Sequence, residues 1–235
     1  MRVSLFFNHD QFIQTTAYSD NSLFRQQLRQ TPRQTMSLKK SSLRSTLRSK
    51  RQAIAHEERN LANKNISTCL RKLNIYRASK HVGVYINSPF EAPTDSLVAQ
   101  NKRWQKSSYT PVITSLRNSH MRFAKVTSKT CFRKNSLGII EPLVPKSKLY
   151  SALKLDIIFL PLVGFDRDCN RLGMGKGFYD RFLQHRLTTT IFKKPVLIGL
   201  AFDEQEVNNV PIDRWDVPLD GIVTSSGKII WKPST

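Results

Sequence analysis

Apolar residues recur every three or four positions in the first half of the chain, and this spacing places them on one face of an α-helix. Leu38, Leu43 and Leu47 follow it, so we expect a helix that begins near Ser37. A second helix is expected over residues 57–73. Both helices are strongly basic, and each is predicted to bury one apolar face against a core.

Farther along the chain, most of the segments rich in apolar residues contain short apolar runs rather than a strict alternation of apolar and polar residues. Such runs are typical of strands that helices cover on both faces, as in a parallel sheet. A third helix, residues 94–104 with Thr94 as its N-cap, falls between the first two runs. The runs that predict strands are residues 81–86, 110–114, 121–126, 155–163, 196–202 and 221–224.

This order of elements predicts an α/β fold, in which residues 36–235 form a single three-layer α/β/α domain with an open, mostly parallel sheet. Residues 1–35 show no clear periodicity and are rich in Gln, Asn, Ser and Thr, so we expect a poorly ordered extension. Met36 is an alternative start of the protein. A cytoplasmic location is expected, and the sequence leaves open whether residues 1–35 direct the chain to an organelle.

A glycine-rich basic turn follows the strand predicted over residues 155–163. Its three glycines, Gly173, Gly175 and Gly177, lack Cβ atoms, so main-chain N–H groups can converge on an anion. A helix is expected to begin near Gly177 and to point its positive end at the same place. Arg171 and Lys176 add charge, the first as a planar fork and the second as a mobile point charge. The turn therefore predicts a polyphosphate site.

Two named phosphate motifs are excluded by their spacing. A P-loop needs glycine where Asn170 stands and Ser or Thr where Gly177 stands, and a dinucleotide fingerprint needs a small residue at Phe178. The competing interpretation is a tight structural turn with a helix cap. Three alternating glycines beside two cations favour the phosphate site over it.

The chain has 235 residues, of which 39% are hydrophobic, and is long enough to bury one sizeable core. Its longest apolar run, residues 157–165, falls far short of the ~20 residues that span a bilayer, so no membrane association is expected. The cysteines lack the spacing of a zinc site or a disulfide framework, which fits a reducing compartment. They are Cys69, Cys131 and Cys169.

The formal net charge of +21 is unevenly distributed. Residues 36–80 carry twelve Lys or Arg against two acids and residues 101–155 twelve against one, whereas residues 156–235 have ten of each. Such an excess attracts polyanions, including nucleic acid, nucleotides and carboxylate-rich substrates. A nucleic-acid-binding protein with a basic N-terminal arm is therefore the rival hypothesis. No RNA or DNA motif supports it, and we do not expect nucleic acid as a partner.

Residues 155–181 resemble the signature segment of the 5-formyltetrahydrofolate cyclo-ligase family, whose members are also called methenyltetrahydrofolate synthetases. The family pattern is an apolar strand ending in proline, a Gly-Phe-Asp loop and then RLGxGxGYYD. The similarity covers about residues 37–230 and departs from the pattern at Phe178, where tyrosine is usual, and at Trp215, where many members have histidine. The matching elements are Pro161, Gly164-Phe165-Asp166, RLGMGKGFYD, Lys40 with Leu43-Arg44, Glu91 with Thr94, and a closing series over residues 205–224.

The resemblance implies an ATP- and Mg²⁺-dependent ring closure that converts 5-formyltetrahydrofolate to 5,10-methenyltetrahydrofolate and releases ADP and phosphate. The formyl oxygen would first be phosphorylated, so the protein mainly positions groups and neutralises charge. We expect a monomer that acts on a reduced folate, with or without a polyglutamate tail. An ATP-dependent ligase for another formyl or carboxylate substrate remains an alternative.

The resemblance also implies roles for individual residues. Lys176 and Arg171 are the expected catalytic pair, Ile86, Glu91 and Tyr179 the substrate contacts, and Asp180 with Asp216 the magnesium ligands. Asp220 is expected to be structural. The expected ATP-binding residues are Lys40, Arg44, Arg171, Leu172, Gly173, Met174, Gly175, Lys176, Gly177, Phe178 and Tyr179.

Overall fold

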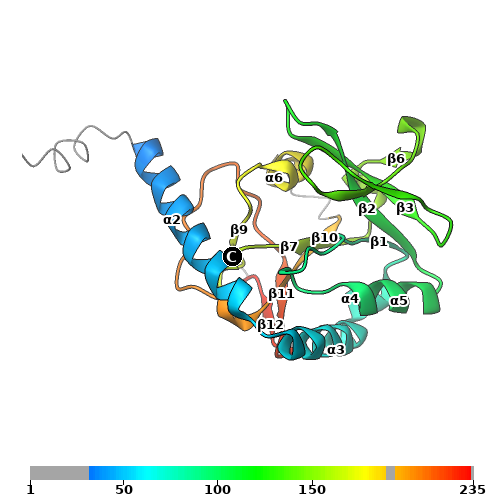
Figure 1. Ribbon diagram of the computed structural model, residues 1–235, viewed down its shortest axis with the longest axis horizontal. Coiled ribbons are helices and arrows are strands. Elements are labelled where there is room, and N and C mark those ends of the chain that lie inside the picture. Colours follow the sequence, from blue (N-terminus) through cyan, green and yellow to red (C-terminus); the bar gives the residue numbers. More distant parts are fainter. Residues whose placement is uncertain (1–31, 189–193, 234–235) are drawn as a thin grey trace, which may run out of the picture. The chain divides into compact units, whose positions relative to one another are not determined.

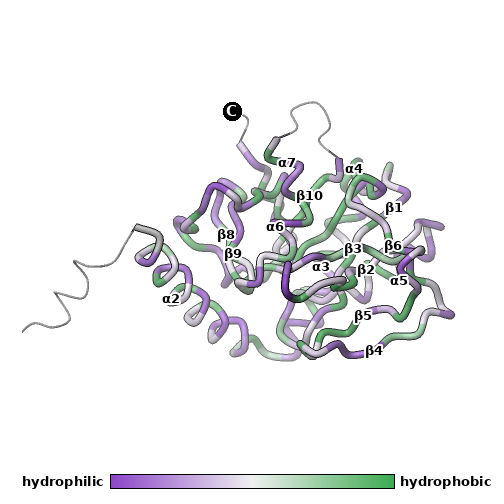
Figure 2. The backbone as a smooth tube through the Cα atoms, turned by 90° about the horizontal axis from the view of Figure 1, so that it is seen from above, coloured by the Kyte–Doolittle hydropathy of each residue, from purple (hydrophilic) through white to green (hydrophobic). Residues whose placement is uncertain are grey.

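The computed structural model describes residues 32–188 and 194–233. Residues up to Ser37 and residues 38–235 form two compact units, and the fold below is that of the second. Most of the predicted extension, residues 1–31, lies outside the described residues, whereas Pro32 to Thr35 already belong to the first helix, α2 (Pro32–Ala53). This helix begins five residues before the predicted position. Figure 2 shows polar and apolar residues interleaved along it.

An eight-stranded sheet forms the centre of the second unit, in the order β12-β11-β10-β7-β1-β2-β3-β6. The five strands from β11 to β2 run parallel, and β12, β3 and β6 are antiparallel additions at the two edges. The mostly parallel sheet is therefore confirmed. The strands are β1 (His81–Gly83), β2 (Ser107–Ser115), β3 (His120–Val126), β6 (Leu149–Tyr150), β7 (Ile157–Pro161), β10 (Val196–Ala201), β11 (Gly221–Thr224) and β12 (Ile229–Trp231).

Side chains of the central strand β7 alternate between two cores. Ile157 and Phe159 pack toward one face of the sheet, and Ile158 and Leu160 pack toward the other. Helices α3 (His56–Lys72), α4 (Asn74–Ala78) and α5 (Asp95–Arg103) cover the first face, and α6 (Phe178–Leu183) covers the second (Figure 1). The prediction of three α/β/α layers is therefore correct.

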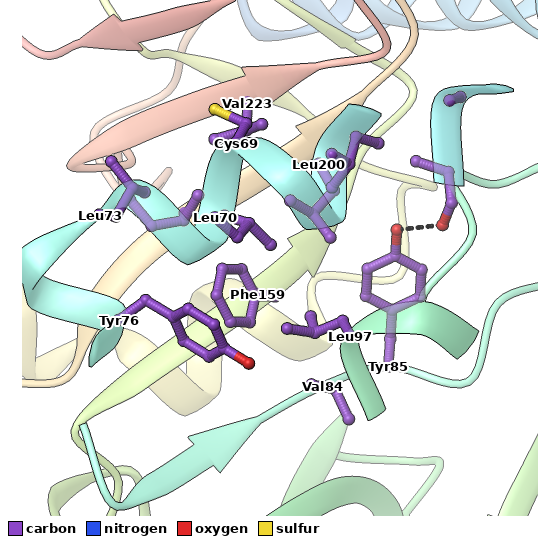
Figure 3. Close-up of a cluster of buried hydrophobic side chains, with 14 of the residues drawn as sticks. Cys69, Leu70, Leu73, Tyr76, Val84, Tyr85, Leu97, Phe159, Leu200 and Val223 are labelled. Carbon is purple, nitrogen blue, oxygen red and sulfur yellow. Dashed lines mark hydrogen bonds between the residues drawn. The ribbon is translucent and has the colours of Figure 1, made fainter. Parts of the chain in front are cut away.

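The core under α3 combines apolar packing with satisfied polar groups (Figure 3). Phe159 is fully buried there and stacks edge-on against Tyr76 at a centroid distance of 5.7 Å. Burial of each such side chain contributes about 1.5–3 kcal/mol. The Tyr76 hydroxyl donates to Asn101 Oδ1 at 2.7 Å, so its burial leaves no unpaired hydroxyl.

Several short elements were not predicted from the sequence. Two of them form a hairpin, β8 (Gly164–Phe165) with β9 (Arg171–Leu172), which leads from the end of β7 into the glycine turn. Runs of two or three residues are too short to show a period, which is why they escaped prediction. The others are α4, β6, β12, β4 (Phe132–Lys134), β5 (Ile140–Pro142), α7 (His185–Thr188) and the 3₁₀ turns η1 (Lys146–Lys148), η2 (Ala152–Lys154) and η3 (Asp203–Gln205).

Two expectations near the first strand need correction. The strand predicted over residues 81–86 ends at Gly83, and an irregular segment leads from it to α5. Thr94 does occupy the N-cap position of α5, but its hydroxyl does not cap the helix. It donates instead to the Tyr85 carbonyl at 3.0 Å, which fixes the start of the irregular segment.

Within residues 32–188 and 194–233, no helix has the length and apolar character needed to cross a bilayer.

Candidate functional site

The glycine turn lies beyond the carboxyl end of β7, as expected for ligand sites in parallel sheets. Gly175 and Gly177 have φ values of +94° and +68°, a backbone conformation that side chains with a Cβ rarely adopt. Gly177 is the N-cap of α6, so the predicted helix begins at Phe178 but has only six residues. An anion bound at this turn would therefore be held mainly by the turn's own amides rather than by the dipole of a long helix.

Arg171 is the most buried cation of the turn. Its guanidinium donates from Nη2 to Asp180 Oδ1 at 2.5 Å and lies over the Tyr179 ring at 5.9 Å. Its Nε is buried and has no hydrogen-bond partner within residues 32–188 and 194–233. A buried donor without a partner is costly, and an anionic ligand beside the turn would satisfy it. The structure thus brings together three of the predicted site residues.

Helix α2 contributes two further predicted cations. Arg44 donates from Nε to the Gly173 carbonyl at 2.8 Å, and a Cβ on Gly175 would lie 3.5 Å from its guanidinium carbon. Lys40, one turn earlier, is buried and donates to Asp213 at 2.6 Å and to Asp216 at 2.5 Å. Both residues therefore face the glycine turn and its neighbouring loop, as their four-residue spacing predicts.

The two expected magnesium ligands lie on adjoining segments, because Asp180 Oδ1 accepts from the main-chain N–H of Val217, the residue after Asp216. Among the described residues, the contacts of each carboxylate fall on one oxygen: Oδ1 of Asp180 and Oδ2 of Asp216. The other oxygens suit a hard cation. No cluster of three or more His, Cys, Asp or Glu in the described part of the chain could hold a metal alone. A Mg²⁺ ion held by these two carboxylates would therefore need phosphate and water oxygens to complete its shell.

Asp213 was missed by the sequence analysis. Its carboxylate shares Lys40 with Asp216, and its main-chain N–H donates to Asp216 Oδ2 at 2.8 Å. The signal that could have found it is the Asp-x-x-Asp spacing at residues 213–216, which is also the spacing of a loop that hydrogen-bonds to itself. Asp220 accepts from the Leu197 N–H at 2.8 Å and from Arg186 at 2.5 Å, in agreement with its predicted structural role.

Glu91 lies in the turn after β1, where its Oε2 accepts from the Ser88 N–H at 2.8 Å. Burial raises the pKa of Tyr179, and the nearby Glu91 carboxylate raises it further. Burial also raises the pKa of Tyr85, and the Glu91 carboxylate raises it further. Glu91 and Tyr179, two predicted substrate contacts, therefore lie close enough for the carboxylate to affect the phenol. Ile86, the third, is partly buried and directly follows Tyr85.

Arg51 is a buried cation that the sequence did not single out. Only 5% of Arg51 is exposed. Its Nη1 donates to the Leu162 carbonyl at 3.3 Å, and its Nε has no hydrogen-bond partner among the described residues. Burial lowers its pKa, and Glu91 opposes that change. Residues 40, 44, 47 and 51 follow the helical period, so the inward stripe of α2 was readable from the sequence.

The remaining predicted residues differ in what they can offer a nucleotide. Lys176 and Met174 are exposed on the turn. Leu172 is 1% exposed and packs with Leu47, so only its main chain can contribute to binding. Phe178 is partly buried against the second core. Its ring packs against apolar side chains there, so the position does not require the hydroxyl of the tyrosine that is usual in the family.

Comparison with known proteins gives one family. The family model for 5-formyltetrahydrofolate cyclo-ligases matches residues 36–225. The chain is 32% identical to the 5-formyltetrahydrofolate cyclo-ligase of Haemophilus influenzae, over 79% of this chain and 97% of that one. It is 30% identical to the enzyme of the same name from Mus musculus, over 80% of this chain and 95% of that one.

A solved structure gives the same result. The NMR structure of Aquifex aeolicus 5,10-methenyltetrahydrofolate synthetase superimposes with a TM-score of 0.70 at 28% identity, covering 83% of this chain and 94% of that one. The matched region includes the glycine turn, the inward stripe of α2 and the Asp213–Asp216 loop. The chain therefore belongs to the 5-formyltetrahydrofolate cyclo-ligase family.

Proposed function

We propose that this protein catalyses the ATP-dependent closure of 5-formyltetrahydrofolate to 5,10-methenyltetrahydrofolate, with release of ADP and phosphate. The observation that carries the proposal is the glycine turn of a chain of the cyclo-ligase family. Arg44 and Arg171 lie against this turn, and Lys176 is exposed on it. A nucleic-acid-binding role is not favoured by the family match. We propose the cytoplasm as its location and a monomer as its working form.

The chemical difficulty is that a formamide carbon is a poor electrophile and its oxygen a poor leaving group. In the proposed reaction the formyl oxygen attacks the γ-phosphorus, and the bond from that phosphorus to the β–γ bridging oxygen breaks to give ADP. N10 of the folate then adds to the activated carbon and loses its proton, and phosphate leaves with the former formyl oxygen. No nucleophilic side chain is required, so positioning and charge stabilisation supply the rate acceleration.

The proposed roles follow from where each side chain lies. The amides of residues 173–177 and the Lys176 ammonium bind the terminal phosphates, and Lys176 stabilises the charge that develops on the transferred group. The buried Arg171 orients Asp180 and Tyr179 and offers its unpartnered Nε to the ligand. Lys40 and Arg44 complete the cation set along α2.

Asp180 and Asp216 would hold Mg²⁺, which when bound neutralises phosphate charge. Glu91 would accept hydrogen bonds from the amino and amide N–H groups of the pterin, with Tyr179 and Ile86 against its rings. The basic surface would attract ATP and the carboxylates of the folate tail, with or without polyglutamate.

The activity is tested by incubating purified protein with ATP, Mg²⁺ and 5-formyltetrahydrofolate and recording the ultraviolet absorbance of the methenyl product. Formation of product only when all three are present is the expected result. Absence of product with correctly folded protein would refute the proposal. Product formed equally well from a different formyl or carboxylate compound would favour the ligase of another substrate.

The phosphorylated intermediate has its own test. When the formyl oxygen carries ¹⁸O, the label should appear in the released inorganic phosphate, because that oxygen leaves bonded to phosphorus. Release of unlabelled phosphate would contradict phosphorylation of the formyl group even if the ring closes.

A further inference from the structure

The turn that carries Glu91 is closed by its own hydrogen bonds. The Glu91 N–H donates to the Ser88 carbonyl at 3.1 Å, and Glu91 Oε2 accepts from the Ser88 N–H at 2.8 Å. On its C-terminal side, the Tyr85 hydroxyl donates to the Ala92 carbonyl at 2.5 Å (Figure 3). These contacts shape the turn, but they do not attach its tip to α2, the helix whose inward stripe carries Lys40 and Arg44.

Arg59, in the first turns of α3, makes that attachment. Its Nη2 donates to the Arg51 carbonyl at 2.6 Å, its Nε to the Ile54 carbonyl at 3.1 Å and its Nη1 to the Pro89 carbonyl at 3.1 Å. One planar group therefore joins the end of α2, the α2–α3 connection and the tip of the Glu91 turn. A planar fork with fixed donor directions can satisfy carbonyls on separate segments, whereas a lysine ammonium cannot reproduce that geometry.

Two aromatic rings keep the guanidinium in this plane. The Arg59 guanidinium carbon lies 5.4 Å from the ring centroids of both Phe90 and Phe202. Phe202 is 1% exposed and belongs to the core, while Phe90 belongs to the Glu91 turn itself. Cation–π contacts thus reinforce the connection between the turn and the body of the protein.

We propose that Arg59 is a positioning residue for the cyclo-ligase reaction: its guanidinium fixes the Glu91 turn against the C-terminal end of α2 and so sets the geometry of the pterin contact. This rests on the proposed function of Glu91. Arg59 does not touch the substrate itself. It links the turn that contacts folate to the helix that supplies Lys40, Arg44 and Arg51 to the site.

The test compares wild-type protein with Arg59→Met, which keeps an apolar stem and removes the fork. The KM for 5-formyltetrahydrofolate should rise about tenfold, while the KM for ATP changes less than about twofold, because the lost interaction orients only the folate contact. Hydrogen exchange at the amides of Ser88 and Glu91 should accelerate by about tenfold or more. Arg59→Lys should show smaller changes in both the folate KM and the exchange rates, because lysine keeps the charge but lacks the planar fork. If Arg59→Met does not fold, Arg59→Lys takes its place in the comparison.

Asn65→Ala is the matched control, since Asn65 also lies on α3 and donates to a distant carbonyl, that of Ser225, at 2.9 Å. It should lower thermal stability and leave the folate KM unchanged. An equal rise in folate KM in Asn65→Ala, or unchanged exchange at Ser88 and Glu91 in Arg59→Met, would overturn the inference. If wild-type protein forms no methenyl product, the proposed function fails, but the exchange comparison still decides whether Arg59 fixes the turn.

Discussion

At the scale of single residues, the cations of the site differ in how firmly they are placed. Arg171 is 7% exposed and fixed by Asp180, and Lys40 is fixed by two carboxylates, whereas the Lys176 side chain is exposed. Fixed cations preorganise the site, and a mobile one can follow a phosphoryl group as charge develops. Lys176 is therefore the residue whose loss should affect turnover most and folding least.

We predict that Lys176→Ala lowers kcat by about 10²-fold or more while the melting temperature stays within error of wild type. Steady-state kinetics and thermal unfolding measure the two quantities. The control is Lys228→Ala, which removes an exposed lysine paired with Glu206. Near-normal turnover in Lys176→Ala would exclude Lys176 from stabilising the transferred phosphate.

The positions of site residues were predictable where a spacing has a geometric meaning. Lys40 and Arg44 lie four residues apart and do face one side of the site. The pairings of these residues were not predictable, because Arg171 with Asp180 and Lys40 with Asp213 depend on how separate segments meet. Arg51 was not singled out from the sequence because a basic helix residue is usually solvated, and only the packed structure shows this one buried beside Leu162.

At the scale of elements, the proposed phosphate site depends on the backbone conformation of the glycine turn. Gly175 has φ +94° and lies against Arg44, whereas Gly138 has φ +73° with no atom within 4 Å of an added Cβ. Substitutions at both glycines incur the energetic cost of a positive φ, but only a substitution at Gly175 also alters the proposed phosphate-binding turn. Comparing the two variants therefore separates these effects.

Gly175→Ala and Gly138→Ala should each destabilise the protein by about 1–2 kcal/mol, because alanine disfavours the left-handed region. Only Gly175→Ala should weaken ATP binding, by about tenfold or more, since its turn supplies the anion-binding amides. Denaturant unfolding and calorimetric titration with ATP separate the two effects. Equal ATP affinity in both variants would remove the turn from the nucleotide site.

The 3₁₀ turn η3 illustrates an element stabilised by one carboxylate. Asp203 accepts hydrogen bonds from Thr224, from Ser225 and from the side chain and N–H of Ser226. Partial burial alone would raise the pKa of Asp203, but the hydrogen bonds outweigh it and lower the pKa from its ordinary 3.8. Its stabilisation is therefore present above pH 3.8 and is lost as the pH falls through the lower pKa of the folded protein.

We predict that Asp203→Asn melts below wild type at neutral pH and that the difference narrows on acidification below about pH 4, because only the wild type loses a charged acceptor. Melting temperatures across the acidic range provide the measurement. Glu204→Gln, exposed on the same turn, serves as the control. A difference that stays constant or widens as the pH falls would contradict this role for Asp203.

At the scale of the whole molecule, the short apolar runs in most of the predicted strands indicated a helix-covered parallel sheet, because strands buried on both faces have no polar side. The strand order was not predictable, since it depends on which runs pair across long crossovers. The edge strands β6 and β12 and the hairpin β8–β9 were not predicted for a different reason, because their strands are only two or three residues long. The hairpin matters most, because it leads from β7 into the glycine turn.

The central claim is that the main chain around Gly175, with its surrounding cations, binds the polyphosphate of ATP. The most direct measurement is a crystal structure of the protein with a non-hydrolysable ATP analogue and Mg²⁺. The account predicts phosphate oxygens within hydrogen-bonding distance of the amides of residues 173–177, with Lys176 on the terminal phosphate. An analogue bound elsewhere, with the turn directed away from it, would contradict the claim.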